Sequence, residues 1–209
     1  MRSNRDQFVV FDLGGVLIDW DPRHLYRRLF DDEEQMEWFL ANVTTHEWNV
    51  LQDRGRSLTE ATEELVARHP EHEELIRAYY ERWPEMLAGS IGDNVATLAD
   101  VRAAGLPLYA LTNWSAETFA QARRKFEFLD WFLGIVVSGE EGMAKPDQAI
   151  FHVLLDRYGL RAPDTTFIDD SAANVEQARR VGLDAIHYVS PSQLRAGLQE
   201  RGLLAVTKP

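Results

Sequence analysis

Short apolar runs alternate with amphipathic stretches along most of the chain, and the runs are bounded by glycine, proline or acidic residues. The first run is Phe8–Phe11, and four more lie after residue 107, at 108–111, 135–137, 166–168 and 185–189. Continuous apolar runs of this length are typical of strands that are buried on both faces of a sheet. The pattern therefore predicts five buried strands.

Helical spacing fills the intervals between the later strands. Apolar residues recur at 95, 98 and 101, at 150, 151, 154 and 155, and at 175, 178 and 181. A glycine suited to ending a helix follows each stretch, at Gly105, Gly159 and Gly182. Alternation of strands and helices predicts a three-layer, Rossmann-like α/β fold, in which helices cover a parallel sheet through right-handed crossovers.

The segment 16–88 breaks this alternation. It holds no run that predicts a strand, whereas Asp21-Pro22 and Ser57–Glu60 carry residue patterns that begin helices. We predict a small all-helical cap over residues 16–88, inserted after the first strand, and an α/β core formed by residues 1–15 and 89–209. An insertion at this point is expected to cover the end of the first strand as a lid.

Composition narrows the class of protein. The 209 residues are 45% hydrophobic, which suffices for one core and a small second lobe. A formal net charge of −12 disfavours non-specific binding to nucleic acid or to an acidic membrane. The chain has no cysteine, which excludes disulfides, thiol catalysis and thiolate zinc sites.

The ends and the apolar runs of the chain bear on its location. Met1–Gln7 is polar and charged, so we predict no signal peptide, and no run approaches the ~20 apolar residues of a membrane span. We expect a cytoplasmic protein without nucleic-acid or membrane partners. It is expected to be a monomer or a homodimer, and composition does not distinguish the two.

Chemically active residues follow the predicted strands. Asp12 follows the first strand, Thr112-Asn113 the second and Asp169-Asp170 the fourth, while Lys145-Pro146 opens the helix after the third. Ligands of open α/β sheets bind outside the carboxyl ends of the strands. We therefore expect these residues to meet at one edge of the sheet, although each taken alone is also a common helix cap or turn.

The set suits chemistry on a phosphate ester. Asp12 is an anionic nucleophile able to form an acyl phosphate. Its carboxylate and those of Asp169 and Asp170 repel one another unless a cation lies among them, and Mg²⁺ prefers such oxygen ligands. Thr112 offers a hydroxyl next to a predicted helix start, and Lys145 offers a fixed positive charge for a phosphate dianion.

In combination these motifs resemble those of the haloacid dehalogenase superfamily, in the subgroup with a helical cap after the first motif. Phe11–Leu17 is similar to motif one, Leu111–Asn113 to motif two, Lys145-Pro146 to motif three and Ile168–Asn174 to motif four. The resemblance covers nearly the whole chain. It implies a Mg²⁺-dependent phosphatase that hydrolyses a small phosphorylated substrate, such as a sugar phosphate, through an aspartyl-phosphate intermediate.

The resemblance also implies roles for single residues. Asp12 would be the phosphorylated nucleophile, Thr112 and Asn113 would bind the phosphoryl group, and Lys145 would steady both nucleophile and phosphate.

The implied metal ligands come from motifs one and four. Asp12, Asp170 and the backbone carbonyl of Gly14 would contact Mg²⁺ directly. Asp169 would belong to the same site, either around the metal or orienting Lys145.

Gly14 departs from the family pattern. Most phosphatases of the superfamily carry there a second aspartate, which protonates the leaving group and then activates water. Such acid–base help is typically worth ~10²–10⁴ in rate. We therefore expect slower turnover and a preference for better leaving groups, such as anomeric or aryl phosphates. A cap residue is the alternative proton donor, with Asp19, Asp21, His24 and His46 as candidates.

The segment Gln52–Arg56 resembles a cap loop that reaches the active site. Arg54 or Arg56 could meet an anionic or hydroxylated leaving group there. A solvated charged turn is the alternative interpretation.

Two other functions remain open at this point. A metal-independent 2-haloacid dehalogenase would share the fold, and Trp114 could line its apolar pocket, but the Asp169-Asp170 pair would have no clear purpose. A non-catalytic binding or regulatory protein would explain Gly14 as decay, but it would not explain why Asp12, Lys145 and Asp170 are all present.

Overall fold

A five-stranded parallel sheet forms the centre of the protein, with strand order β5-β4-β1-β6-β7. The computed structural model describes residues 7–205, so nearly all of Met1–Gln7, where no signal peptide is expected, lies outside the described residues. Each strand lies within two residues of a predicted apolar run, which confirms the α/β fold class. The strands are β1 (Phe8–Phe11), β4 (Leu108–Thr112), β5 (Gly134–Val137), β6 (Thr165–Asp169) and β7 (Asp184–His187).

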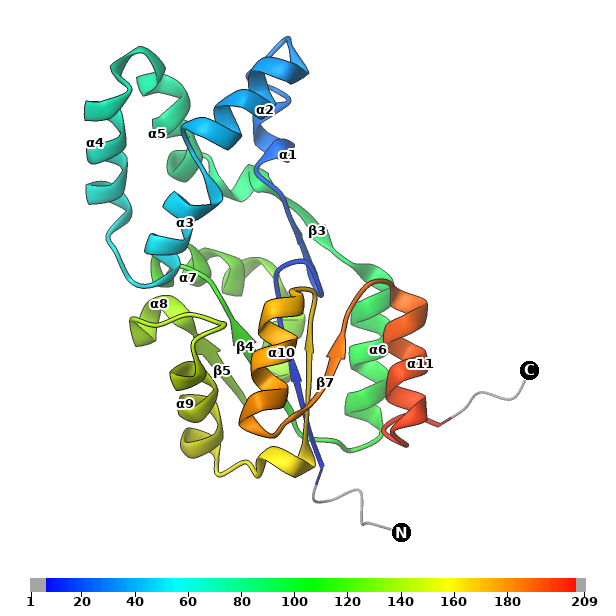
Figure 1. Cartoon of the computed structure of the whole chain (residues 1–209). Coiled ribbons are helices and arrows are strands. Elements are labelled where there is room, and N and C mark those ends of the chain that lie inside the picture. The colour runs from blue at the N-terminus through cyan, green and yellow to red at the C-terminus, as the bar shows by residue number, and fades with distance from the viewer. Residues whose placement is uncertain (1–6, 206–209) are drawn as a thin grey trace.

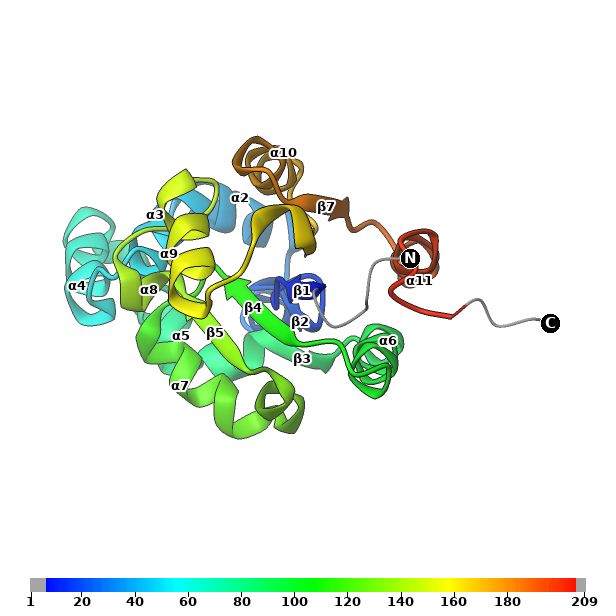
Figure 2. The same cartoon turned by 90° about the horizontal axis from the view of Figure 1, so that it is seen from below.

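Helices cover both faces of this sheet, because alternate strand residues are buried on opposite sides. Val9 and Phe11 of β1 belong to one apolar cluster and Val10 to the other. Figure 2, which looks along the strands, shows the two helical layers. The first cluster lies under α6 (Gly92–Ala103), α7 (Ala116–Lys125) and α11 (Pro191–Glu200). The second lies under α9 (Gln148–Tyr158) and α10 (Ala172–Val181).

All three glycines that were predicted to end helices have positive φ, including Gly105 after α6 with φ of 77°. Gly159 and Gly182 follow α9 and α10 with φ of 64° and 96°, a left-handed conformation that other residues adopt at a steric cost. Short connections complete the core: helix α8 (Ser138–Glu141) and the 3₁₀ helices η4 (Glu127–Trp131) and η5 (Ala162–Asp164).

Five helices from the middle of the first half of the chain lie beyond the carboxyl ends of the strands (Figure 1). Ser57 caps α4 as predicted, because its hydroxyl accepts a hydrogen bond from the Glu60 N–H at 3.4 Å. Asp21 accepts from the Arg23 N–H at 2.9 Å and Pro22 has helical dihedral angles, as the Asp-Pro pattern predicts, although α1 is assigned from Arg23. The helices are α1 (Arg23–Tyr26), α2 (Glu33–Asn42), α3 (His46–Asp53), α4 (Leu58–Arg68) and α5 (Glu73–Glu81), with η2 (Pro70–His72) and η3 (Trp83–Met86).

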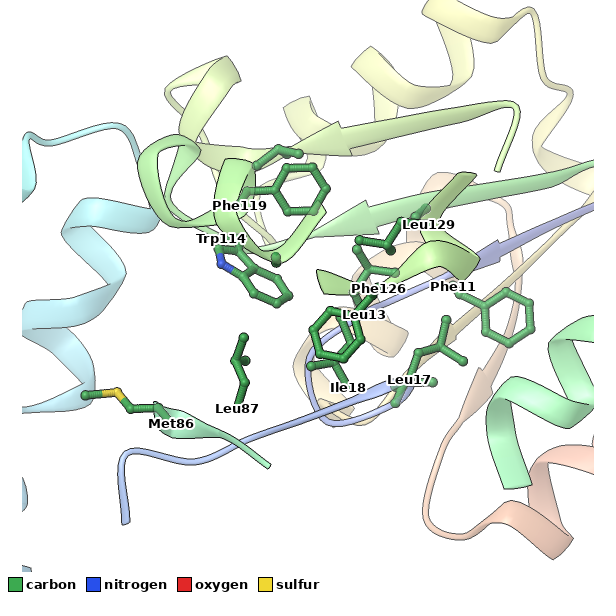
Figure 3. Close-up of a cluster of buried hydrophobic side chains, with 14 of the residues drawn as sticks. Phe11, Leu13, Leu17, Ile18, Met86, Leu87, Trp114, Phe119, Phe126 and Leu129 are labelled. Carbon is green, nitrogen blue, oxygen red and sulfur yellow. The ribbon is translucent and has the colours of Figure 1, made fainter. Parts of the chain in front are cut away.

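The expectation that residues 16–88 form helices alone is wrong at both ends of that segment. β2 (Ile18–Trp20) pairs antiparallel with β3 (Leu87–Ser90), and this ribbon connects the helices to the sheet. In Figure 3 the side chains of Ile18 and Leu87 face an apolar cluster that includes Trp114 and Phe119. Three residues are too short a run to show an alternating pattern, and the partner strand lies far along the chain.

Among the helices that the structure describes, none combines the length and the apolar character needed to cross a membrane.

Gly139 allows α8 to approach the loop after β4. A Cβ at this position would lie 2.5 Å from the Ala116 nitrogen and 2.8 Å from the Trp114 carbonyl oxygen, both of them backbone atoms. We expect Gly139→Ala to lower the free energy of unfolding by about 1–3 kcal/mol, because the backbone must shift. Gly92→Ala, where nothing lies within 4 Å of the new Cβ, is the control and should be neutral or slightly stabilising. Equal denaturant midpoints for the two variants would contradict this account.

Candidate active site

Asp12 lies at the end of the central strand. Its N–H donates to the Ile168 carbonyl at 2.8 Å, so hydrogen bonding to β6 continues one residue beyond β1. Its Oδ1 accepts from the Leu13 N–H at 2.7 Å, and the side chain is nearly buried. These two contacts fix the carboxylate at the rim of the sheet.

Lys145 lies beside Asp12, fully buried in the loop before α9. Its Nζ is 3.0 Å from Asp12 Oδ2 and 2.7 Å from Asp169 Oδ2, and it donates to the Leu111 carbonyl at 2.8 Å. Burial lowers the pKa of Lys145, but the two carboxylates outweigh it and raise the pKa overall. The ammonium is therefore a permanent charge that joins the ends of β1, β4 and β6.

Asn113 holds the loop that carries Lys145. Its Oδ1 accepts from the Lys145 N–H at 2.8 Å, and its Nδ2 donates to the Lys145 carbonyl at 2.9 Å. The side chain of Asn113 thus pairs with backbone and positions the lysine.

Asp169 and Asp170 have different surroundings. Asp169 has no exposed surface, and it accepts from Lys145 and, through Oδ1, from the Ser171 N–H at 2.8 Å and Asn174 Nδ2 at 3.0 Å. Asp170 is exposed toward the cavity described below. The structure therefore engages Asp169 with protein donors and leaves Asp170 available to a ligand.

The three carboxylates carry more negative charge than Lys145 neutralises. Oxygen atoms of Asp12, Asp169 and Asp170 lie within 4.8 Å of one another. Burial raises the pKa of Asp12, Lys145 lowers it, and the other two carboxylates raise it, for a net rise to about 8. An all-oxygen donor set of this spacing and charge fits a hard divalent cation.

Thr112 is the last residue of β4, and its hydroxyl oxygen Oγ1 is buried without a hydrogen-bond partner among the described residues. Buried hydroxyls are normally paired, so this atom fits an oxygen acceptor supplied by a ligand. One backbone N–H group of the following loop is already engaged within the protein, because the Trp114 N–H donates to Ser138 Oγ at 2.8 Å.

Gly14 and Gly15 differ in the room that the structure leaves for a side chain. At Gly14 a Cβ would meet no atom within 4 Å, whereas at Gly15, with φ of 71°, it would overlap the Asp170 carboxylate. Gly15 thus permits the close approach of motifs one and four. Sequence reasoning missed this requirement, because a close contact with a residue so distant in the chain leaves no local signal.

A cavity of about 540 Å³ lies over these residues. Asp12, Gly14, Asn113, Lys145 and Asp170 line it from the core. Its other walls include Trp114 of the core and residues from the segment 16–88, namely Trp20, His46, Asn49, Val50, Asp53, Arg54, Tyr80 and Trp83.

Of the two arginines predicted to determine specificity, only Arg54 lines the cavity. No hydrogen bond or ion pair to another described residue holds its guanidinium. Arg56 instead pairs with Glu64 on α4.

Of the four candidate proton donors predicted from the sequence, only one lines the cavity. His46 lines the cavity, whereas Asp19 pairs with His24 at 2.9 Å, and neither of those two nor Asp21 lines it. Sequence reasoning missed Asp53, which does line it. Asp53 lies between Gln52 and Arg54, in the segment whose two arginines are the predicted specificity residues.

Comparisons with known proteins identify the family of the chain. A model of the haloacid dehalogenase-like hydrolase family matches residues 7–182. The sesquiterpene phosphatase astK of Aspergillus oryzae is 26% identical, covering 85% of this chain and 87% of that protein. The phosphorylated carbohydrates phosphatase of Thermotoga maritima is 26% identical, covering 96% and 94%. The magnesium complex of the HAD family enzyme bt-2542 from Bacteroides thetaiotaomicron superposes with a TM-score of 0.68 at 21% identity, covering 87% and 92%.

The excess negative charge around Asp12 should make the free energy of unfolding depend on pH. In buffer with a chelator, we expect Asp12→Asn to be more stable than the wild type at pH 8 and similar to it near pH ~4. The pKa of Asp12 is raised from 3.8 to about 8 on folding, so wild-type stability is lost as pH rises through that window, whereas asparagine does not ionise. Urea unfolding across this pH range measures the difference, and parallel curves for the two proteins would contradict the charge assignment.

Proposed function

The chain belongs to the haloacid dehalogenase-like hydrolases, and from that premise we propose that it is a Mg²⁺-dependent phosphatase of small phosphate esters that works through an aspartyl phosphate on Asp12. The observation that carries this proposal is the convergence of Asp12, Lys145 and Asp170 at the floor of one cavity. Its phosphatase relatives support the same reaction class.

The reaction begins at the Asp12 carboxylate. A carboxylate oxygen forms a bond to phosphorus while the bond to the leaving oxygen breaks, and the electron pair departs with that oxygen. Lys145 stabilises the negative charge of the phosphoryl group, and the unpartnered hydroxyl of Thr112 donates to it. Water then attacks phosphorus and releases Asp12 and inorganic phosphate.

Asp12, Asp170 and the backbone carbonyl of Gly14 would hold the Mg²⁺. Lys145, Ser171 and Asn174 already engage Asp169, which suits it to orient the site. The ion would neutralise the phosphoryl oxygens and relieve the repulsion among the carboxylates. A related structure that contains magnesium supports this choice of metal.

We assign residues 16–88 to a cap and residues 1–15 and 89–209 to the core. The support is the shared cavity, because Trp20, Asn49 and Arg54 of the first segment face Asp12 of the second. A cap in this place excludes water from the phosphoryl group.

Aromatic side chains in the cavity favour a leaving group that carries a ring, such as a sugar or an aryl alcohol. The rings of Trp83 and Trp114 pack edge to face, with their centroids 5.6 Å apart, and Trp20 and Tyr80 line the same cavity. Arg54, with no partner among the described residues, would recognise a hydroxyl or an anionic group on the substrate.

An aryl phosphate assay tests the reaction. With 4-nitrophenyl phosphate we expect phosphate release that requires Mg²⁺ and falls at least ~10³-fold in Asp12→Asn, because the nucleophile is lost. 2-Chloropropionate is the parallel substrate. Halide release without metal would instead identify a dehalogenase, and the absence of both reactions would favour the non-catalytic alternative.

Restoring the family's acid tests the interpretation of Gly14. A side chain fits at this position, since a Cβ added there would meet no atom within 4 Å. We expect Gly14→Asp to leave Mg²⁺ affinity similar and to raise the hydrolysis rate of esters with poor leaving groups, by up to ~10²-fold. Isothermal titration with Mg²⁺ and steady-state kinetics measure the two quantities, and loss of metal binding would contradict the assignment of the Gly14 carbonyl.

A further inference from the structure

We propose that Asp53 donates the proton to the leaving oxygen, in place of the aspartate that Gly14 lacks. This inference rests on the proposed phosphatase function and names a catalytic residue for it. It is carried by the position of the Asp53 carboxyl, by the hydrogen bonds that aim it, and by the absence of an equally suitable acid among the described residues of the cavity wall.

Asp53 ends α3 on the side of the cap that faces the core. Helix α3 packs against α8 (Figure 1), and a Cβ at Gly55 would lie 3.1 Å from the Gly139 carbonyl oxygen. Ser115, in the loop after Thr112, lines the same cavity as Asp53, and its backbone N–H favours the charged form of the Asp53 carboxyl and so lowers its pKa. Asp53 therefore faces the same cavity as Asp12 and as the loop after Thr112.

A chain of hydrogen bonds within the cap fixes the Asp53 carboxyl. The Tyr80 hydroxyl donates to Asn49 Oδ1 at 3.1 Å, and Asn49 Nδ2 donates to Asp53 Oδ2 at 3.1 Å. Gln52 Nε2 donates to the Tyr80 oxygen at 3.0 Å. Because Oδ2 is an acceptor in this chain, the acidic proton belongs on Oδ1.

The surroundings of Asp53 favour its protonated form. Burial raises the pKa of Asp53 to about 7, against the smaller opposing effect of the Ser115 N–H. Within the described residues no Lys, Arg or His forms an ion pair with this carboxyl. A carboxylic acid that retains its proton near neutral pH suits general acid catalysis.

The other proton carriers on the cavity wall are less suitable. His46 is exposed and lies seven residues earlier in α3, roughly 10 Å farther along the helix axis from the core-facing end. The Tyr80 proton is committed to Asn49, and burial raises the pKa of Tyr80 well above its usual range. Arg54 does not release a proton at ordinary pH.

The proton balance closes over one turnover. As Asp12 bonds to phosphorus and the ester bond breaks, the leaving oxygen takes the proton from Asp53, which becomes a carboxylate. Water then attacks the aspartyl phosphate, its proton passes to Asp53, and the electron pair of the breaking bond returns to Asp12. Asp53 is thereby reset as an acid.

Leaving groups of graded acidity test this role, with 4-nitrophenyl, phenyl and benzyl phosphate as substrates. We expect Asp53→Asn to change kcat/KM for 4-nitrophenyl phosphate by less than about threefold but to lower it roughly 10²-fold for benzyl phosphate, whose alkoxide needs a proton. Gly14→Asp combined with Asp53→Asn should restore hydrolysis of benzyl phosphate, because the acid then comes from the core side.

Glu74→Gln is the control, since Glu74 is an exposed cap carboxylate on α5 and lies outside the cavity. It should match the wild type on all three esters. An equal loss on all three esters in Asp53→Asn, with no rescue by Gly14→Asp, would make Asp53 a structural residue and overturn the proposal. A selective loss for benzyl phosphate in His46→Asn and not in Asp53→Asn would overturn it in favour of His46.

The failure of the proposed function would look different. In that case the wild type would hydrolyse none of the three esters in the presence of Mg²⁺. A wild type that hydrolyses them by a route dependent on Asp12, with a flat response in Asp53→Asn, would retain the phosphatase and reject only the acid.

Discussion

The buried ammonium of Lys145 holds the rim of the sheet together. It contacts the Asp12 and Asp169 carboxylates and the Leu111 carbonyl, at the ends of β1, β6 and β4. A buried charge is tolerated only when it is paired and hydrogen-bonded on all sides. The position of Lys145 therefore depends on the strand order, and the geometry of the strand ends depends in turn on Lys145.

The same arrangement leaves the site with an excess of negative charge, which a divalent cation would offset. Three carboxylates meet one ammonium, and the protein donors around Asp169 relieve only that member of the group. Asp12 and Asp170 remain directed at the cavity without enough positive charge. Functional sites commonly retain such tension, because groups arranged for a ligand are not arranged for the greatest stability of the free protein.

With glycine at position 14 and Asp53 as the proposed acid, the proton donor comes from the cap, whereas most phosphatases of the family carry it on the core. With an aspartate at position 14, nucleophile and acid would both stand on the core, and their spacing would not depend on the cap. With Asp53 as the acid, the two groups come from different segments and meet only when α3 lies against the Ser115 loop. Closure of the cap then becomes part of catalysis as well as a barrier to water.

The sequence by itself determined the sheet and the edge that carries the candidate site, because both follow from local pattern. Runs buried on both faces marked the five core strands, and parallel strands necessarily bring Asp12, Thr112 and Asp169-Asp170 to one edge. Helix α11 was not predicted, and of α7 only a start after Thr112 was expected, because α7 has a strongly polar sequence in which few residues are buried. The local pattern was sufficient wherever each element buried its own apolar face.

Only the tertiary structure decided the features that join distant segments. The β2–β3 ribbon pairs residues about seventy positions apart, and Gly15 is required by the approach of Asp170. Arg54 and Arg56 are alike in sequence, yet one faces the cavity and the other pairs with Glu64. The sequence did not single out Asp53 for the same reason. The charge state of a carboxyl on a helix depends on what covers it, and packing between distant segments decides that.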